Sequence, residues 1–431
     1  MCGGGDAEVR SQAVAQCIED IRAADFVALD LEFSGLFLST ESNRPLSIED
    51  YYAKCARSIP EFLPLQLGIC CAHQRQSDAV WELRAHEFNL WPQARRHFIS
   101  DLKSLQFLRA HGFDFNAFLE SGYTYCRLPA LERGQKRPRR RPLPHATQIL
   151  QALREARLPL VFHNGLLDLM HLYVSFVDDL PEDHREFVES WTMHFPLLFD
   201  TRYVAQKGQY SVLRHAGSLT LDALHRHLSG FDSTLMPVRF ESCGPLPDRG
   251  PAHGSSGHDA LLTAKVFLME LELWIRSAAS DLAIKRHRKA RLQELEESLT
   301  ALSWQAVHEQ ALALGVSITK TIVNGRFGGA QGARRKVAEI RADIAALEYA
   351  REMDASRADG DGLDPGLAAG CKLLAEEGKS CITPGALRSH KVCRKFQNRL
   401  ALVGASPGYL QVGEKPPAIA SNADLEEEKD V

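Results

Sequence analysis

The stretch Phe26-Val27-Ala28-Leu29-Asp30-Leu31-Glu32 decides how this chain folds. Four apolar residues followed by an acidic-apolar-acidic triplet are typical of a buried strand that reaches the edge of a sheet. Residues two apart on a strand point to the same side, so we expect Asp30 and Glu32 to leave one face at the strand's carboxyl end. Open α/β sheets bind ligands there. Acidic-x-acidic triplets also arise by chance, so the apolar context, not the triplet alone, indicates a site.

Further acidic residues follow apolar segments in the same way. Residues 159–162 predict a short strand, the turn at 163–165 follows it, and the next helix carries Asp168. A later predicted helix opens with Asp259. Acidic side chains also favour helix N-termini through capping and the helix dipole, and this simpler interpretation stays open for both. For Asp200, which follows another apolar stretch, the helix cap or a supporting role is the preferred interpretation.

The order of the predicted elements indicates an α/β fold with helical layers. Short apolar strands alternate with helical patterns over residues 1–275, and a basic loop at 133–145 interrupts them. Leucines at heptad-like spacing and a second helical pattern predict a helical extension over 276–353. Residues 354–431 are expected to form a linker, a small helical region and a disordered acidic tail.

The composition is that of a globular protein. Hydrophobic residues make up 45% and charged residues 25% of the chain, which excludes collagen-like, purely coiled-coil and wholly disordered classes. No apolar stretch approaches the roughly 18 residues of a membrane helix, and the first residues lack the pattern of a signal peptide. The ten cysteines are scattered through a long chain, so we expect free thiols inside the cell. Because the net charge is −4, any contact with a polyanion must be local.

Asp30, Glu32, Asp168 and Asp259 form a set that suits metal ions. Each lies where an apolar element meets a polar turn, and four carboxylates without cationic partners would repel one another. A pair of hard divalent cations would remove that cost, and Mg²⁺ prefers such oxygen ligands. Two such ions can bind the attacking and leaving oxygens of a displacement at phosphorus. A nearby histidine could accept the proton of the attacking water.

Three ordered motifs carry a resemblance to a known family. DLEFSG at 30–35, HNGLLDLMH at 163–171 and DALLT at 259–263 resemble the exonuclease motifs of DEDD-type deadenylases. QFL at 106–108, HGFDFN at 111–116, FP at 195–196 and FDT at 199–201 are supporting matches. The family includes poly(A)-specific ribonuclease and a Cajal-body relative that trims small nuclear RNA tails. The short basic loop and the absence of an RNP-like motif resemble the Cajal-body relative more.

The resemblance implies an RNase H-like fold with a mixed central sheet flanked by helices. It implies removal of adenosines from RNA 3′ tails in the 3′→5′ direction, with release of 5′-AMP. Carried over, Asp30, Glu32, Asp168 and Asp259 would hold two Mg²⁺ ions, which Mn²⁺ could replace, and Glu32 would also orient the attacking water. The implied partner is single-stranded RNA with an adenosine-rich 3′ end, with no membrane involved.

The general base departs from the family pattern. The family histidine lies five positions before the last aspartate, where this chain has Gly254. A one-residue insertion would give that role to His253, and His258 is the alternative. This displaced histidine supports a second hypothesis, a weak or inactive nuclease fold that serves as an RNA-binding scaffold. A DNA exonuclease of the same fold is a third.

Two further expectations concern the basic loop and the assembly. KRPRRR at 136–141 predicts nuclear localisation, with cytoplasmic presence also open, or a contact with RNA phosphates. A homodimer is kept open because family members can dimerise. The cysteines and histidine at 371–393 lack the spacing of a zinc site.

Overall fold

The computed structural model describes residues 4–38, 45–128, 143–207, 218–231, 236–244, 255–314, 328–355, 380 and 382–413. Several predicted features lie outside these residues. They are His253, most of the basic loop 133–145, residues 356–379 of the C-terminal region and the acidic tail.

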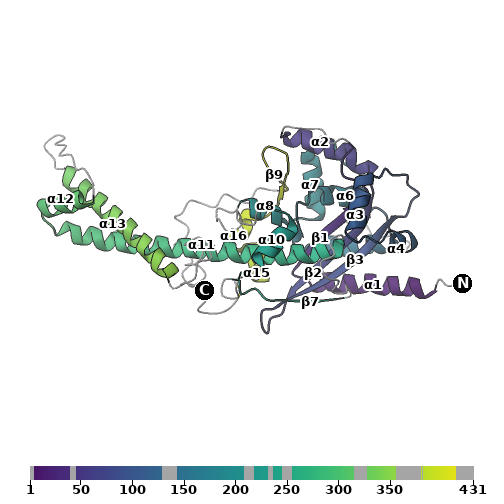
Figure 1. The fold of residues 1–431 in the computed structure, drawn as a ribbon, viewed down its shortest axis with the longest axis horizontal. Coiled ribbons are helices and arrows are strands. Elements are labelled where there is room, and N and C mark those ends of the chain that lie inside the picture. Colours follow the sequence, from purple (N-terminus) through teal and green to yellow (C-terminus); the bar gives the residue numbers. More distant parts are fainter. Residues whose placement is uncertain are drawn as a thin grey trace, which may run out of the picture.

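One mixed sheet organises the chain (Figure 1). Its strands are β1 (Phe26–Phe33), β2 (Pro64–Gln74), β3 (Trp81–Pro92), β4 (Tyr123–Tyr125), β5 (Leu160–Phe162), β6 (Leu198–Asp200) and β7 (Phe240–Cys243). They lie in the order β4-β3-β2-β1-β5-β6, and β7 pairs with the start of β3. β2 runs antiparallel to β1 and β3, whereas β5 is parallel to β1 and β6 is parallel to β5. The predicted RNase H-like arrangement, a mixed central sheet flanked by helices, is confirmed.

The two faces of the sheet bury different cores. Along β1, Val27, Leu29 and Leu31 belong to one hydrophobic cluster and Phe26 and Ala28 to another. This alternation follows from the two-residue period of a strand. Because Asp30 and Glu32 continue the phase of Phe26 and Ala28, both carboxylates emerge on the second face.

Helices cover both faces. They are α1 (Gly4–Ala23), α2 (Ile48–Ser58), α3 (Leu102–Ala110), α4 (Phe115–Glu120), α5 (His145–Ala156), α6 (Leu166–Phe176), α7 (His184–His194), α8 (Thr201–Gln206), α10 (Leu221–Leu228) and α11 (Ser256–Thr300), with a 3₁₀ turn at Ile59–Glu61. Residues of α1, α5, α6 and α7 fill the first core, and those of α8, α10 and α11 fill the second. Among the described helices, none is long and apolar enough to cross a membrane.

α11 leaves the sheet and continues into a helical arm (Figure 1). Its 45 residues span roughly 67 Å at 1.5 Å per residue. α12 (Trp304–Ala313) and α13 (Gly328–Ala355) pack on its distal half around a small core of their own, which includes Leu299, Val307 and Val337. The boundary predicted at residue 275 therefore falls inside one continuous helix, and the helical extension begins without a break.

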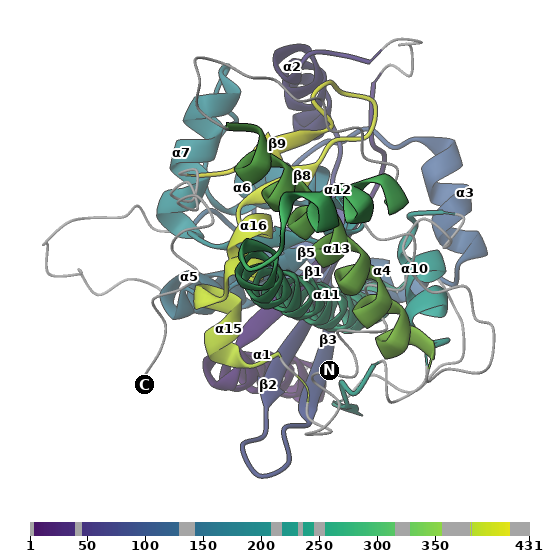
Figure 2. The same cartoon turned by 90° about the vertical axis from the view of Figure 1, so that its left-hand side faces the viewer.

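The C-terminal segment returns to the sheet. It forms α15 (Pro384–Ser389), α16 (Lys391–Phe396) and the strands β8 (Arg399–Ala401) and β9 (Tyr409–Gln411), which pair with each other. Leu400 and Val412 belong to the first core, while Ile382 and Phe396 belong to the second. Figure 2 looks along α11 and shows β8 and β9 beside α6 and α7. Residues 382–413, which lie within the region 354–431 predicted to hold a linker, a small helical region and an acidic tail, thus share the cores of the sheet.

Candidate metal centre

Three of the predicted acidic residues meet at the carboxyl end of β1. Oxygen atoms of Asp30, Glu32 and Asp259 all lie within 4.8 Å of one another. β1 supplies the first two, and the first turn of α11 supplies the third. On β1, the face that carries Phe26 and Ala28 is buried against α11. The same face carries Asp30 and Glu32 where α11 begins, so these carboxylates lie at the end of the second core.

A glycine lets α11 approach closely enough to deliver Asp259. Gly68 lies opposite Asp30 on β2. A Cβ atom at this position would lie 1.8 Å from the carbonyl oxygen of Ser256, the first residue of α11. Because that oxygen belongs to the backbone, only glycine fits without moving the helix.

Polar side chains on β2 and β3 hold the start of α11. Gln66 Oε1 accepts hydrogen bonds from the Ser256 backbone N–H and from Ser256 Oγ, both at 3.1 Å. Glu87 Oε2 accepts a bond from the Gly257 N–H at 3.4 Å and one from the Ser255 hydroxyl. These bonds satisfy donors that a helix N-terminus leaves unpaired. Gln66, Gly68 and Glu87 were missed by the sequence analysis, because nothing local links them to a helix 170 to 190 residues away.

Asp168 reaches the same strand from the other side. It is the third residue of α6, in a helix that packs in the first core, and it is buried. Its Oδ1 accepts a hydrogen bond from the Leu31 N–H at 3.0 Å. β5 pairs with β1 only at Val27 and Ala28. Beyond the end of this parallel ladder, the Asp168 carboxylate bonds to the Leu31 N–H of β1 instead. Asp168 is not within the group of three, but it lies against the strand that carries two of them.

The burial of these carboxyl groups raises their pKa values. Burial, reinforced by the three other carboxylates, holds the pKa of Asp30 well above its usual range. Burial and then Asp259, Asp168 and Glu87 raise the pKa of Glu32 to about 8. Burial raises the pKa of Asp168 to about 7, although two backbone N–H groups oppose the shift. A divalent cation would relieve both desolvation and repulsion, so the residues present fit a hard metal ion.

Asp200 has the supporting role that was preferred for it. Fully buried at the end of β6, it caps α8 by accepting bonds from the Arg202 and Tyr203 N–H groups at 2.9 and 3.3 Å. It also accepts bonds from the N–H groups of Asn164 and Gly165, the turn that precedes Asp168.

The histidines divide into two groups. His258 lies next to Asp259 in the first turn of α11 and is partly exposed, whereas His253 is outside the described residues, so the choice between them stays a prediction. His163 and His171 belong to the second motif, and the pKa values of both rings are lowered. Burial, with a smaller effect of Arg202, lowers the pKa of His163 to about 4. Burial lowers the pKa of His171 to about 3, and its ring stacks on Phe33 with centroids 4.2 Å apart.

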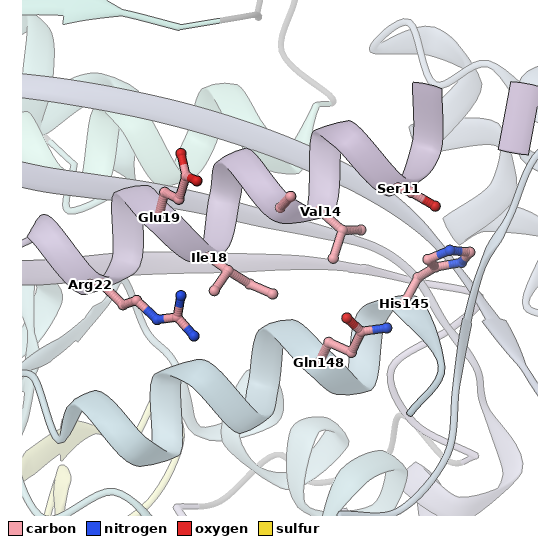
Figure 3. Close-up of a pocket in the computed structure, with 8 residues that line it drawn as sticks. Ser11, Val14, Ile18, Glu19, Arg22, His145 and Gln148 are labelled. Carbon is pink, nitrogen blue, oxygen red and sulfur yellow. The ribbon is translucent and has the colours of Figure 1, made fainter. Parts of the chain in front are cut away.

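A hollow elsewhere has different chemistry. It encloses about 300 Å³ between α1 and α5 and is lined by Ser11, Glu19, Arg22, His145 and Gln148 among others (Figure 3). α1 and α5 pack in the first core, so this hollow belongs to the opposite side of the sheet from Asp30. With a single carboxylate it does not resemble the predicted site.

The comparisons with known proteins agree with the motifs. Residues 9–143 and 130–267 match the model of the CAF1 family ribonucleases. Poly(A)-specific ribonuclease PNLDC1 of Mus musculus is 23% identical over 368 residues, which cover 60% of this chain and 69% of that protein. Poly(A)-specific ribonuclease PARN of Xenopus laevis is 31% identical over 115 residues, which cover 24% of this chain and 18% of that protein. The predicted resemblance to poly(A)-specific ribonucleases is confirmed.

One solved structure shows a distant likeness. The Mg²⁺- and Mn²⁺-bound form of Pop2p from S. pombe aligns with a TM-score of 0.40 at 18% identity, over 61% of this chain and 88% of that chain.

Proposed function

Because this chain belongs to the CAF1 family of ribonucleases, we propose that it is a metal-dependent 3′→5′ exoribonuclease that removes adenosines from RNA 3′ tails. The product would be 5′-AMP. The observation that supports this most is the meeting of Asp30, Glu32 and Asp259. Asp168 accepts a hydrogen bond from the N–H of Leu31, which lies between the first two on β1. The names of the relatives, poly(A)-specific ribonucleases, support adenosine tails as the substrate class.

The four carboxylates would hold two Mg²⁺ ions, or Mn²⁺ in their place. When bound, such ions neutralise the carboxylates and stabilise the charge that develops on the reacting phosphate. The protein itself fixes its acidic side chains through β1, α6 and α11 before substrate arrives, so little reorganisation is needed. Glu32 would orient the attacking water, and His253 or His258 would accept its proton.

A gel time course tests the proposal directly. Short 5′-labelled RNAs that end in each of the four nucleotides are incubated with the protein, with Mg²⁺ or with excess chelator. We expect stepwise shortening of the adenosine-ended RNA, release of 5′-AMP, and arrest by chelator. A matching DNA oligomer distinguishes ribonuclease from deoxyribonuclease, because only RNA carries the 2′-OH.

Variants separate the site from the fold. Asp30→Asn removes a proposed ligand, whereas Glu120→Gln removes an exposed carboxylate from α4. We expect loss of trimming with Asp30→Asn alone. Undiminished trimming by Asp30→Asn, or in chelator, would reject the proposal. Binding of oligo(A) without any turnover by the parent would favour the scaffold instead.

Three finer expectations stay predictions. The basic stretch KRPRRR at 136–141, from which nuclear localisation was predicted, lies outside the described residues. A homodimer and a natural substrate among messenger or small nuclear RNAs are likewise predictions from the sequence and its resemblance.

A further inference from the structure

The C-terminal hairpin, formed by β8 and β9 with the turn between them, is bonded to the carboxylate that holds the turn before Asp168. Asp200 Oδ2 accepts hydrogen bonds from the Ala401 N–H at 3.0 Å and from the Gly165 N–H at 3.2 Å. Its Oδ1 accepts a bond from the Asn164 N–H at 3.0 Å. One buried side chain thus joins two segments more than two hundred residues apart.

The turn that Asp200 holds determines where α6 begins. Asn164 has a φ of 60°, in the left-handed region. A Cβ atom on Gly165 would lie 2.3 Å from Cβ of Phe162, so the turn has little freedom to change. The first bond of the helix runs from the Leu169 N–H to the Gly165 carbonyl at 3.0 Å. Asp168 is therefore displaced by any shift of this turn.

The hairpin is itself fixed to the sheet. Asn398 Oδ1 accepts a bond from the Leu198 N–H at 2.9 Å, and its Nδ2 donates to the Pro196 carbonyl at 3.1 Å. At the other end, the Leu46 N–H donates to the Gly404 carbonyl at 2.9 Å. Leu46 lies just ahead of α2, in the connection that follows β1. The hairpin is therefore bonded to β6 and to the connection between β1 and α2.

We infer that Asp200 is a positioning residue through which the C-terminal hairpin holds Asp168 in place. The inference rests on the proposed function. It makes residues 398–412 part of the catalytic unit, although they follow the helical arm in the sequence. Asp200 touches no reacting atom; it acts through the Asn164–Gly165 turn.

Asp200→Asn tests the role with almost no change of volume. Its amide offers one acceptor oxygen where the carboxylate offered two, so either the two N–H groups bonded to Oδ2 or the three bonded to Oδ1 face a donor. The matched control is Phe396→Leu, which loosens the packing of the same C-terminal segment against Trp274 and has no bond to Asp200. Both variants are made in the full chain. Each is assayed at the same interval below its own melting temperature, so that the two are compared at similar stability.

We expect Asp200→Asn to lower kcat on oligo(A) about 10- to 100-fold, since a small misplacement of a catalytic group has effects of that size. KM should stay unchanged, because Asp200 is fully buried and so does not line the surface that binds RNA. Phe396→Leu should keep the kcat of the parent. Equal kcat for Asp200→Asn and the parent, or equal losses in the two variants at equal stability, would overturn the inference.

Hydrogen exchange gives a readout without activity. Asn398→Gly tolerates the positive φ of 57° at this position and removes both side-chain bonds to the sheet. We expect faster exchange in the hairpin and also in residues 163–169. Faster exchange in the hairpin alone, with unchanged kcat, would contradict the coupling. If the parent itself shortens no RNA, the proposed function fails, while this exchange experiment still decides the coupling.

Discussion

At the scale of single residues, the site places acidic groups where water cannot fully solvate them. Asp30, Glu32 and Asp168 all have raised pKa values, with burial as the first cause. A folded state with raised carboxyl pKa values binds protons that the unfolded state releases. Without metal, stability from this site is therefore present below about pH 4, the ordinary pKa, and is lost as pH rises through the folded-state values of about 7 and 8.

Asp30→Asn should flatten this pH dependence. The variant removes one charge and lowers the repulsion on Glu32 and Asp168. We expect it to be more stable than the parent at pH 8 in chelator, on the order of 2 kcal/mol, with a smaller difference at pH 5. Urea unfolding at both pH values measures this. Mg²⁺ at pH 8 should stabilise the parent more than the variant. An identical pH dependence in both proteins would contradict the account.

Gly68 is the residue at which the sheet permits the helix to approach. Gly68→Ala places a methyl group 1.8 Å from the Ser256 carbonyl, so either α11 shifts or the sheet does. We expect a loss of about 3 kcal/mol in the free energy of unfolding together with loss of trimming. Gly385→Ala in α15 is the matched control, since a Cβ there meets only Thr383 Oγ1 at 4.0 Å. Wild-type trimming by a folded Gly68→Ala protein would be inconsistent with the geometry.

At the scale of elements, the site depends on where α11 starts. Gln66→Leu keeps the side-chain volume but leaves the Ser256 N–H and hydroxyl without their acceptor. We expect a loss of about 1–3 kcal/mol and a higher Mg²⁺ concentration for half-maximal trimming. Gln16→Leu on α1, which removes a bond to Asp20 instead, serves as the control. A Mg²⁺ requirement that is unchanged in Gln66→Leu would show that this cap does not position Asp259.

The same scale shows what the sequence could predict. The acidic-apolar-acidic triplet that follows four apolar residues of β1 and the apolar strand before Asp168 are local signals, so the carboxylates could be found from one segment at a time. The role of Gly68 could not, because a glycine in an apolar run gives no sign of the helix that crosses it. The hairpin was missed for a related reason. Ala401 bonds to Asp200 across 201 residues, and neither residue has a local pattern that indicates the other.

At the scale of the whole molecule, the helical arm has a core separate from the sheet. Val337 of α13 is fully buried in the core that α13 shares with α12 and the distal half of α11. Val337→Asp buries a charge and should destabilise the arm by about 3 kcal/mol or more. Trimming of a short oligo(A) should persist, because Asp30 and Glu32 lie on β1 and Asp259 lies in the first turn of α11, at the opposite end of that helix from the arm. Lys336→Gln, an exposed neighbour, is the control. Loss of trimming in Val337→Asp with the sheet still folded would tie the arm to catalysis.

The central claim is that acidic residues from β1, α6 and α11 converge on cations. Crystals soaked in Mn²⁺ test this most directly, because anomalous scattering locates the metal without reference to activity. We predict anomalous density bounded by Asp30, Glu32 and Asp259, with Asp168 beside it, and its loss in Asp30→Asn crystals. Density elsewhere only, or none at these carboxylates in millimolar Mn²⁺, would contradict the account.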